Sequence, residues 1–222
     1  MSMNRIDKIT LQNLVPPVFM GDPDHEKRHS DVWRRNTSLE RGKLYCIDAA
    51  SGTGKTSLCS FLFGVRRDYA GSIIFNDTNI SSYKIKDWCE IRRRHLAYMP
   101  QELDVFGELT ALDNILLKNR LTHFKTEAEI RQMFEELEID NRINSYCARM
   151  SVGQRQRVAL IRSLCQPLDF ILLDEPVSHL DAVNNAKCAA MVVAEARRQE
   201  ASVVSTSVGN PLAITDPIVL KL

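Results

Sequence analysis

Short apolar runs alternate with longer amphipathic stretches along this 222-residue chain. Apolar runs of about four to eight residues between Gly, Pro or charged positions are typical of buried strands, and apolar residues recurring every three or four positions are typical of helices. The predicted strands cover residues 6–11, 44–49, 72–75, 96–99, 170–173, 203–204 and 218–220. The predicted helices cover residues 55–63, 80–94, 111–121, 126–139, a stretch from 151, and 182–199. This alternation predicts an α/β fold whose mostly parallel sheet has helices on both faces.

From residue 109 to residue 146 the pattern is helical only. The stretches 111–121 and 126–139 are both amphipathic, and the second opens with a Thr-Glu-Ala-Glu sequence suited to a capping box. We therefore expect one domain over residues 1–222, with a core made of 1–104 and 148–222 and a helical subdomain inserted at about 105–147.

Composition narrows the functional classes. The net charge of +1 gives no field that would favour nucleic acid or an anionic membrane. The six cysteines form no Cys-x-x-Cys pair and no Cys/His cluster, which predicts reduced core thiols rather than disulfides or a zinc site. No signal peptide opens the sequence, and no run of about 18 apolar residues could span a bilayer. Contact with a membrane is therefore expected to require a partner.

A Gly-rich loop follows the predicted strand 44–49 and precedes a predicted helix. Residues 49–56 (Ala-Ala-Ser-Gly-Thr-Gly-Lys-Thr) fit the phosphate-loop motif, with Ala49 in place of the first Gly. Glycines let backbone N–H groups surround a phosphate, Lys55 adds a charge, and Thr56 would place a hydroxyl on Mg²⁺. Ala49 adds a Cβ where the turn is tightest, so we expect a slight distortion there. The alternative is a Gly-rich turn before an ordinary helix.

Two acids follow the apolar strand 170–173. Asp174 would hold Mg²⁺ through its water shell, and Glu175 would polarise an attacking water molecule. One acid could merely cap a strand end, but two acids between four apolar residues and Pro176 favour a site. Upstream, residues 151–154 have the Ser-x-x-Gln form of a capping box, which alone predicts only a well-capped helix.

Together these motifs resemble those of the ATP-binding subunits of ATP-binding-cassette (ABC) transporters, over nearly the whole chain. Residues 150–154 resemble the family's Leu-Ser-Gly-Gly-Gln signature with Val152 replacing the first Gly, residues 178–181 its D-loop, and residues 98–101 its glutamine loop. Residues 105–115 are similar to short cassettes of the lipoprotein-release, macrolide-export and cell-division branch. The resemblance implies a P-loop NTPase core with a mostly parallel sheet, an antiparallel β edge subdomain and an inserted α-helical subdomain.

The resemblance also implies cofactors and partners. Two cassettes, as a homodimer or a mixed pair, would enclose two ATP molecules with Mg²⁺, and integral membrane permease subunits would respond to their closure. Gln101 would sense Mg²⁺ and couple to the permease, and Phe19 is the candidate for stacking on adenine, with anchoring of its loop to the core as the alternative. The Mg²⁺ site would comprise Thr56, Gln101 and Asp174. The nucleotide contacts would comprise Phe19, Ala50, Ser51, Gly52, Thr53, Gly54, Lys55, Thr56, Ser57, Ser151, Gly153, Gln154 and Asp181.

Ser207 stands where the family has its switch histidine, which contacts the γ-phosphate and positions the water and the catalytic acid. Losing one preorganised donor typically slows a reaction by about 10²–10³-fold. A serine could donate a weaker hydrogen bond of shorter reach. We therefore expect Glu175, Gln101 and Ser207 to act in catalysis, with ATP binding retained and hydrolysis slow.

The main prediction is an ATP-hydrolysing subunit that powers a membrane transporter or a related mechanotransmission complex. It would be cytoplasmic and held on the inner face of the cell membrane through its partner subunits. One rival is a regulatory module that dimerises on ATP with little turnover. Another is a soluble cassette serving translation or DNA repair, which the single cassette, the lack of a long coiled-coil insertion and the absence of basic bias disfavour. No nucleic-acid partner is expected.

Overall fold

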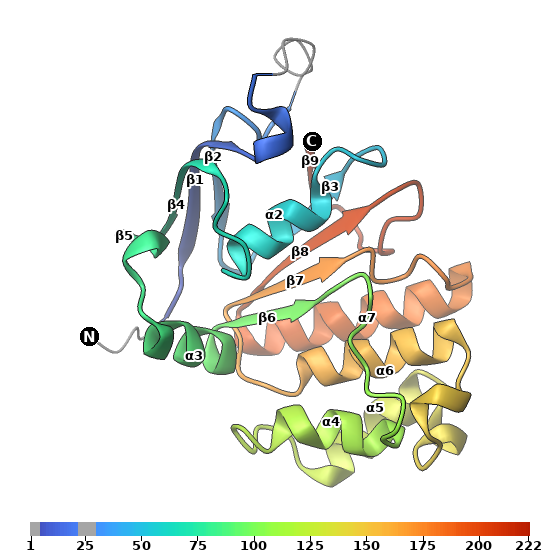
Figure 1. Ribbon diagram of the computed structural model, residues 1–222. Helices are drawn as coiled ribbons and strands as arrows, with labels where there is room; N and C mark the ends of the chain where they lie inside the picture. The colour runs from blue at the N-terminus through green and yellow to red at the C-terminus, as the bar shows by residue number, and fades with distance from the viewer. Residues whose placement is uncertain (1–4, 22–29) are drawn as a thin grey trace.

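The computed structural model describes residues 5–21 and 30–222, which form two sheets (Figure 1). An antiparallel sheet has the order β2-β1-β4-β5, and a parallel sheet has the order β6-β7-β8-β3-β9. The strands of the first are β1 (Lys8–Val15), β2 (Asn36–Glu40), β4 (Ala70–Phe75) and β5 (Thr78–Asn79). Those of the second are β3 (Leu44–Asp48), β6 (Leu96–Met99), β7 (Phe170–Asp174), β8 (Ser202–Ser207) and β9 (Ile218–Lys221). The predicted fold class is confirmed.

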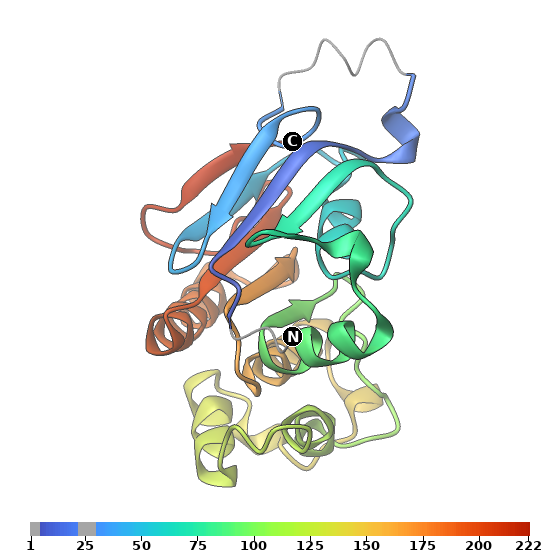
Figure 2. The ribbon, with the colours of Figure 1, turned by 90° about the vertical axis from the view of Figure 1, so that its left-hand side faces the viewer.

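Helices cover both faces of the parallel sheet, as Figures 1 and 2 show. α2 (Lys55–Leu62) lies between the two sheets, and α3 (Ile85–Arg94) packs beside β6. α6 (Val152–Leu164) and α7 (Ala182–Gln199) cover the opposite face. Successive strand residues therefore enter different cores: Leu172 contributes to the core around α2, and Leu173 to the core around α6 and α7.

The layer farthest from the antiparallel sheet consists of α4 (Ala111–Asn119) and α5 (Glu127–Glu136) (Figure 2). The capping box predicted for the helix at 126–139 is present at the start of α5. Thr126 Oγ1 accepts from Glu129 N (3.2 Å), and Glu129 Oε2 accepts from Thr126 N (2.8 Å). Buried Ile115, Ile130 and Phe134 join this layer to α6. Because Ser151 precedes α6, this packing also fixes the start of the helix that carries the signature-like sequence.

Two sequence predictions differ from the structure. The helix predicted over 80–94 begins only at Ile85, after a separate 3-10 turn at Ile80–Ser82. The side chain of Asn79 accepts from Ser81 N (2.9 Å), and an Asp87 carboxylate oxygen accepts from Lys84 N (2.9 Å). These bonds stabilise a turn followed by a new helix start. Strands β2 and β5 were missed by the sequence analysis.

All six cysteines are free, and all but Cys89 are buried. Within residues 5–21 and 30–222, no helix is both long and apolar enough to cross a bilayer.

Candidate functional site

The loop between β3 and α2 bends at two glycines. Gly52 has a φ of +80° and Gly54 a φ of +95°, in the left-handed region that favours glycine. A Cβ at Gly54 would lie 3.0 Å from Cζ2 of Trp33, so a side chain there would press on the indole. Ala49 is not among the residues with positive φ, so alanine in the first motif position brings no backbone strain of this kind.

Two aromatic side chains support this loop from the segment before β2. The Trp33 indole is 2% exposed, and its Nε1–H donates to the carbonyl oxygen of Thr53 at 2.9 Å. Phe19 is 8% exposed, and its ring centroid lies 6.4 Å from that of Trp33. This burial against the loop supports the alternative in which Phe19 anchors its segment to the core. Trp33 belongs to no sequence motif, so the sequence alone does not mark it as a site residue.

Lys55 is buried at the end of the loop, with 5% of its surface exposed. Its Nζ donates to the carbonyl oxygen of Ala50 at 2.9 Å and lies 3.7 Å from Oε1 of Glu175. The structure therefore brings the phosphate-loop cation and the second acid together, as the sequence predicts. In this arrangement the ammonium group is held by the backbone carbonyl oxygens of Ala49 and Ala50 and lies near the Glu175 carboxylate.

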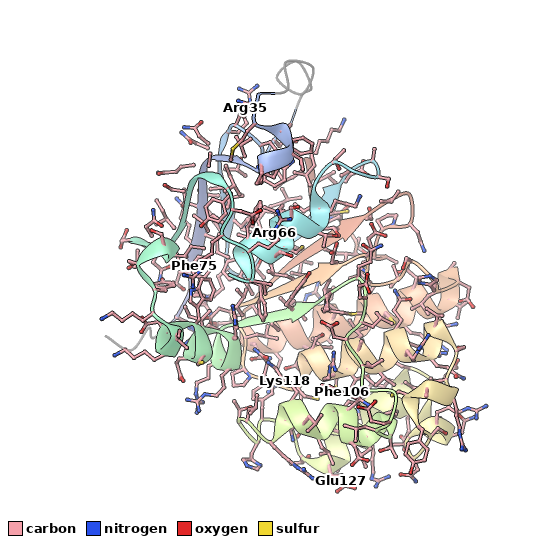
Figure 3. All side chains as sticks on the ribbon, in the orientation of Figure 1. Arg35, Arg66, Phe75, Phe106, Lys118 and Glu127 are labelled. Carbon is pink, nitrogen blue, oxygen red and sulfur yellow. The ribbon has the colours of Figure 1, made fainter. Side chains whose placement is uncertain are left out.

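The neighbouring hydroxyl groups of α2 have different surroundings. Thr56 Oγ1 donates to Oε1 of Gln101 at 3.5 Å, and both residues are exposed. Ser57 Oγ instead accepts from Nη1 of Arg66 at 3.0 Å, and Figure 3 labels Arg66 near the end of α2. Thr56 and Gln101 are thus available to a ligand, whereas the Ser57 hydroxyl is engaged by Arg66.

Asp174 ends β7 and is fully buried. Its Oδ1 accepts from Thr206 Oγ1 at 2.7 Å, but its Oδ2 has no hydrogen-bond partner within residues 5–21 and 30–222. A buried carboxylate oxygen without a partner is costly unless a cation or water compensates it. Oxygen ligands are those that Mg²⁺ prefers, and Asp174, Thr56 and Gln101 can all supply them. The donor set therefore fits the cation that the sequence analysis expects.

The hydroxyl of β8 that reaches the acids belongs to Thr206 rather than Ser207. Thr206 pairs in register with Asp174 of β7, so both side chains lie on the same face of the sheet. Ser207, one residue on, lies on the other face of the sheet, the face that also carries the Cys46 thiol of β3. Burial raises the pKa of the Cys46 thiol, and the nearby Ser207 hydroxyl opposes that rise. The sequence analysis missed Thr206, although strand alternation and register could have identified it.

The signature-like segment forms the start of α6 as predicted. Ser151 Oγ accepts from Gln154 N (3.2 Å), and Gln154 Oε1 accepts from Ser151 N (3.0 Å). Ser151 and the neighbouring Val152, which is 40% exposed, lie open at this end of the helix. A Cβ at Gly153 would lie 3.2 Å from the carbonyl oxygen of His179, so glycine permits the close approach of the D-loop-like segment.

Gln156 joins α6 to the segment after β7. It is 1% exposed, and its Nε2 donates to the Glu175 carbonyl oxygen (3.1 Å) and to Ser178 Oγ (3.3 Å). Its Oε1 accepts from His179 N (3.2 Å). The sequence analysis also missed this residue, because a glutamine within a helix carries no signal of its partners.

Asp181 is the N-cap of α7. Its carboxylate accepts from the backbone and the side chain of Asn184 at 2.8 to 3.0 Å. These hydrogen bonds, led by the one from the Asn184 backbone, lower the pKa of Asp181. The structure thus gives Asp181 a helix-capping role.

The fold and the site define a P-loop nucleotide-binding protein, and comparison with known proteins identifies its family. The family model described as ABC transporter matches residues 34–178. The chain therefore belongs to the ABC transporter family, as its motifs predict.

Relatives in this family include two ATP-binding proteins. The chain is 28% identical over 177 residues to ABC transporter ATP-binding protein YtrE of Bacillus subtilis, covering 78% of this chain and 77% of the relative. It is 33% identical over 153 residues to the lipoprotein-releasing system ATP-binding protein LolD of Treponema denticola, covering 67% of each. Other relatives are longer, and the chain spans 64% of ABC transporter ATP-binding protein Rv0073 of Mycobacterium tuberculosis. The predicted similarity to lipoprotein-release cassettes is confirmed.

Solved structures share the fold. The dimeric structure of MJ0796, a bacterial ABC transporter cassette, aligns with a TM-score of 0.78 at 22% identity, covering 96% of this chain and 94% of that one. A post-hydrolysis MJ0796 dimer bound to ADP and phosphate aligns with a TM-score of 0.74 at 20% identity, covering 90% and 87%.

Proposed function

We propose that this chain binds ATP, pairs with a second cassette across two nucleotides, and hydrolyses ATP to power a membrane transporter or a related mechanotransmission complex. The observation that carries the proposal is the arrangement at the end of β7. Asp174 presents a buried carboxylate oxygen without a described partner, and Glu175 lies 3.7 Å from the phosphate-loop Lys55. Capping a strand end does not require an unpaired carboxylate oxygen, a second acid and a buried cation in one place.

Each group would have a separate task. The loop N–H groups around Gly52 and Gly54 and the ammonium group of Lys55 would bind phosphate oxygens. Thr56, Gln101 and Asp174 would hold Mg²⁺, which when bound neutralises charge on the phosphates. On binding, Lys55 would exchange its contact with the Ala50 carbonyl for one with phosphate. Glu175 would then be free to accept a proton from the attacking water.

Pairing with a second cassette is supported by the start of α6. Ser151 and Val152 are exposed at the start of α6, and a helix N-terminus attracts anions. We propose that Ser151, Gly153 and Gln154 meet the ATP bound by the partner cassette. The dimeric MJ0796 cassette offers the precedent for such a pair.

A groove beside α4 is the proposed docking place for a permease segment. Its volume is about 250 Å³, and its walls include Tyr98 of β6, Phe106 and Lys118. Figure 3 shows the last two near each other beside α4. Phe106 (49%), Leu117 (43%) and Leu121 (54%) remain exposed there. Through such a permease the chain would act in the cytoplasm on the inner face of the cell membrane, and no nucleic-acid partner is proposed.

Hydrolysis is proposed to be slow, because Ser207 lies on the face of the sheet opposite to that of Asp174. The second candidate, a regulatory module that dimerises on ATP with little turnover, rests on the same observation. Ser207→His is expected to raise the ATPase rate, since an imidazole reaches farther than a hydroxyl and can stabilise transition-state charge. An unchanged rate in this variant would contradict the explanation.

ATP-driven pairing can be tested by light scattering on the Glu175→Gln variant. With Mg²⁺ and ATP the mass is expected to rise from 25.3 kDa to twice that value, and with ADP to stay at 25.3 kDa. Val152→Glu should prevent the rise, because it adds a negative charge where α6 would meet phosphate. The matched control is Val65→Glu, which alters an exposed valine outside α6 and should leave the rise intact. A monomer under all conditions would contradict the pairing.

A further inference from the structure

Glu175 has an unusual backbone for a residue with a side chain. Its φ is +50°, in the left-handed region, between the end of β7 and Pro176. For a non-glycine residue this conformation is strained and persists only where the surroundings hold it. The surroundings of Glu175 must therefore supply that restraint.

Two buried side chains hold the two backbone polar groups of Glu175. Its N–H donates to Oγ1 of Thr206 at 3.1 Å, and its carbonyl oxygen accepts from Nε2 of Gln156 at 3.1 Å. Thr206 is 0% exposed and Gln156 is 1% exposed, so both partner side chains are held in the core. The two partners come from different elements, β8 and α6.

The Thr206 hydroxyl forms hydrogen bonds with both Asp174 and Glu175. While its oxygen accepts from Glu175 N, its O–H donates to Oδ1 of Asp174 at 2.7 Å. That donation fixes the rotation of the Asp174 carboxylate and leaves Oδ2 as the bare oxygen. A single hydroxyl thus orients both acids. Its neighbour Ser207 cannot do so, because it lies on the other face of the sheet.

We propose that Thr206 and Gln156 are positioning residues that clamp the Glu175 backbone and so aim its carboxylate at the phosphate loop. This inference rests on the proposed ATP hydrolysis. Of the groups proposed to bind Mg²⁺ and ATP, the clamp contacts only Asp174, so its loss should slow hydrolysis without weakening the binding of ATP measured in EDTA. A displacement of about 1 Å at a catalytic group can cost on the order of 10²-fold in rate.

The test compares Thr206→Val, which keeps the shape but loses the hydroxyl, with Thr206→Ser, which keeps the hydroxyl. The kcat of Thr206→Val is expected to fall roughly 10- to 100-fold, with the Kd for ATP in EDTA near that of the parent. Its unfolding midpoint should fall, because Glu175 N–H and Asp174 Oδ1 lose their partner. Thr206→Ser is expected to recover most of the rate. The matched control is Ser205→Ala, which removes a buried hydroxyl of the same strand that donates to Tyr45 O instead (3.4 Å), and it should hydrolyse at the parent rate.

Gln156→Met provides a second variant in case Thr206→Val does not fold. It keeps the side-chain length, removes the donor to Glu175 O, and is expected to lower kcat without raising the Kd for ATP. A Thr206→Val or Gln156→Met protein with the parent kcat would overturn the clamp, as would a loss of rate matched by a loss of ATP affinity. A parent chain that hydrolyses no ATP would instead refute the proposed function, and the clamp with it.

Discussion

Asp174→Asn is expected to make the nucleotide-free protein more stable while it disables hydrolysis. The carboxylate is fully buried and receives one hydrogen bond, from Thr206, while Oδ2 has no partner in the part of the chain that the structure describes. A buried unpaired charge costs more than a buried unpaired amide, because desolvation of an ion is the larger penalty. The amide oxygen of the variant can still accept the Thr206 bond.

The magnitude follows from that difference. Leaving a neutral group unsatisfied costs about 1–3 kcal/mol, and more for a charged one, so we expect a gain of roughly 1–3 kcal/mol in the free energy of unfolding. For a chain of this length each kcal/mol shifts Tm by about 2–4 °C, so Tm should rise by roughly 2–12 °C. Saturating Mg²⁺ and ATP should stabilise the parent by about 2–4 kcal/mol, and the variant by much less.

Asp169 provides the matched control at the other end of β7. It is also buried, but its Oδ2 accepts from Ile6 N (2.8 Å) and lies 2.7 Å from His95 Nδ1. Asp169→Asn should therefore lower the free energy of unfolding by about 1–3 kcal/mol. Urea unfolding of the parent and both variants, first with EDTA and then with Mg²⁺ and ATP, measures these free energies. If Asp174→Asn were less stable than the parent in EDTA, the carboxylate would be paired and the argument for a cation site would fail.

Two further predictions concern charged groups other than Asp174 and Glu175. Burial raises the pKa of Glu195, but hydrogen bonds from Arg198 and Lys125 outweigh it and lower the pKa overall, so its stabilisation exists above the unfolded pKa and disappears as pH falls. Glu195→Gln should lower the free energy of unfolding by about 3–5 kcal/mol at pH 7. The urea midpoint of the variant should also fall less than that of the parent as the pH is lowered, and an equal fall in both proteins would contradict this. Burial, with Arg162 nearby, lowers the pKa of Lys118 in the groove to about 8. The unfolded chain then holds more protons above that value, so stability should rise from about pH 8 to pH 10, and Lys118→Met should abolish the rise. A rise that persists in this variant would show that Lys118 is not its source.

Sequence patterns predicted most of the parallel sheet because its strands are buried and apolar. The run 170–173 and the helix 182–199 both lie where the periodicity indicated. β2 was missed because, in Asn36–Glu40, only Leu39 is fully buried, and its pairing with β1 comes from tertiary contacts. β5 has two residues and no pattern of its own.

In the candidate site, too, some residues could be predicted from local sequence patterns and others could not. Residues that belong to local motifs, such as Lys55 and Glu175, were identified because glycines, caps and strand ends mark them in the sequence. Thr206 and Gln156 were missed because their importance depends on strand register and on which helix face meets the segment after β7. The sequence also drew attention to Ser207, whereas side-chain alternation places the useful hydroxyl one residue earlier.

Phosphate release from ATP by the purified chain tests the central proposal most directly. With Mg²⁺ the parent is expected to release phosphate slowly but measurably, and to stop when EDTA removes the metal. Glu175→Gln is expected to lower that rate by at least about 10²-fold while the Kd for ATP stays unchanged. Release that does not depend on Mg²⁺, or a Glu175→Gln protein as fast as the parent, would contradict the assignment of these acids to ATP hydrolysis.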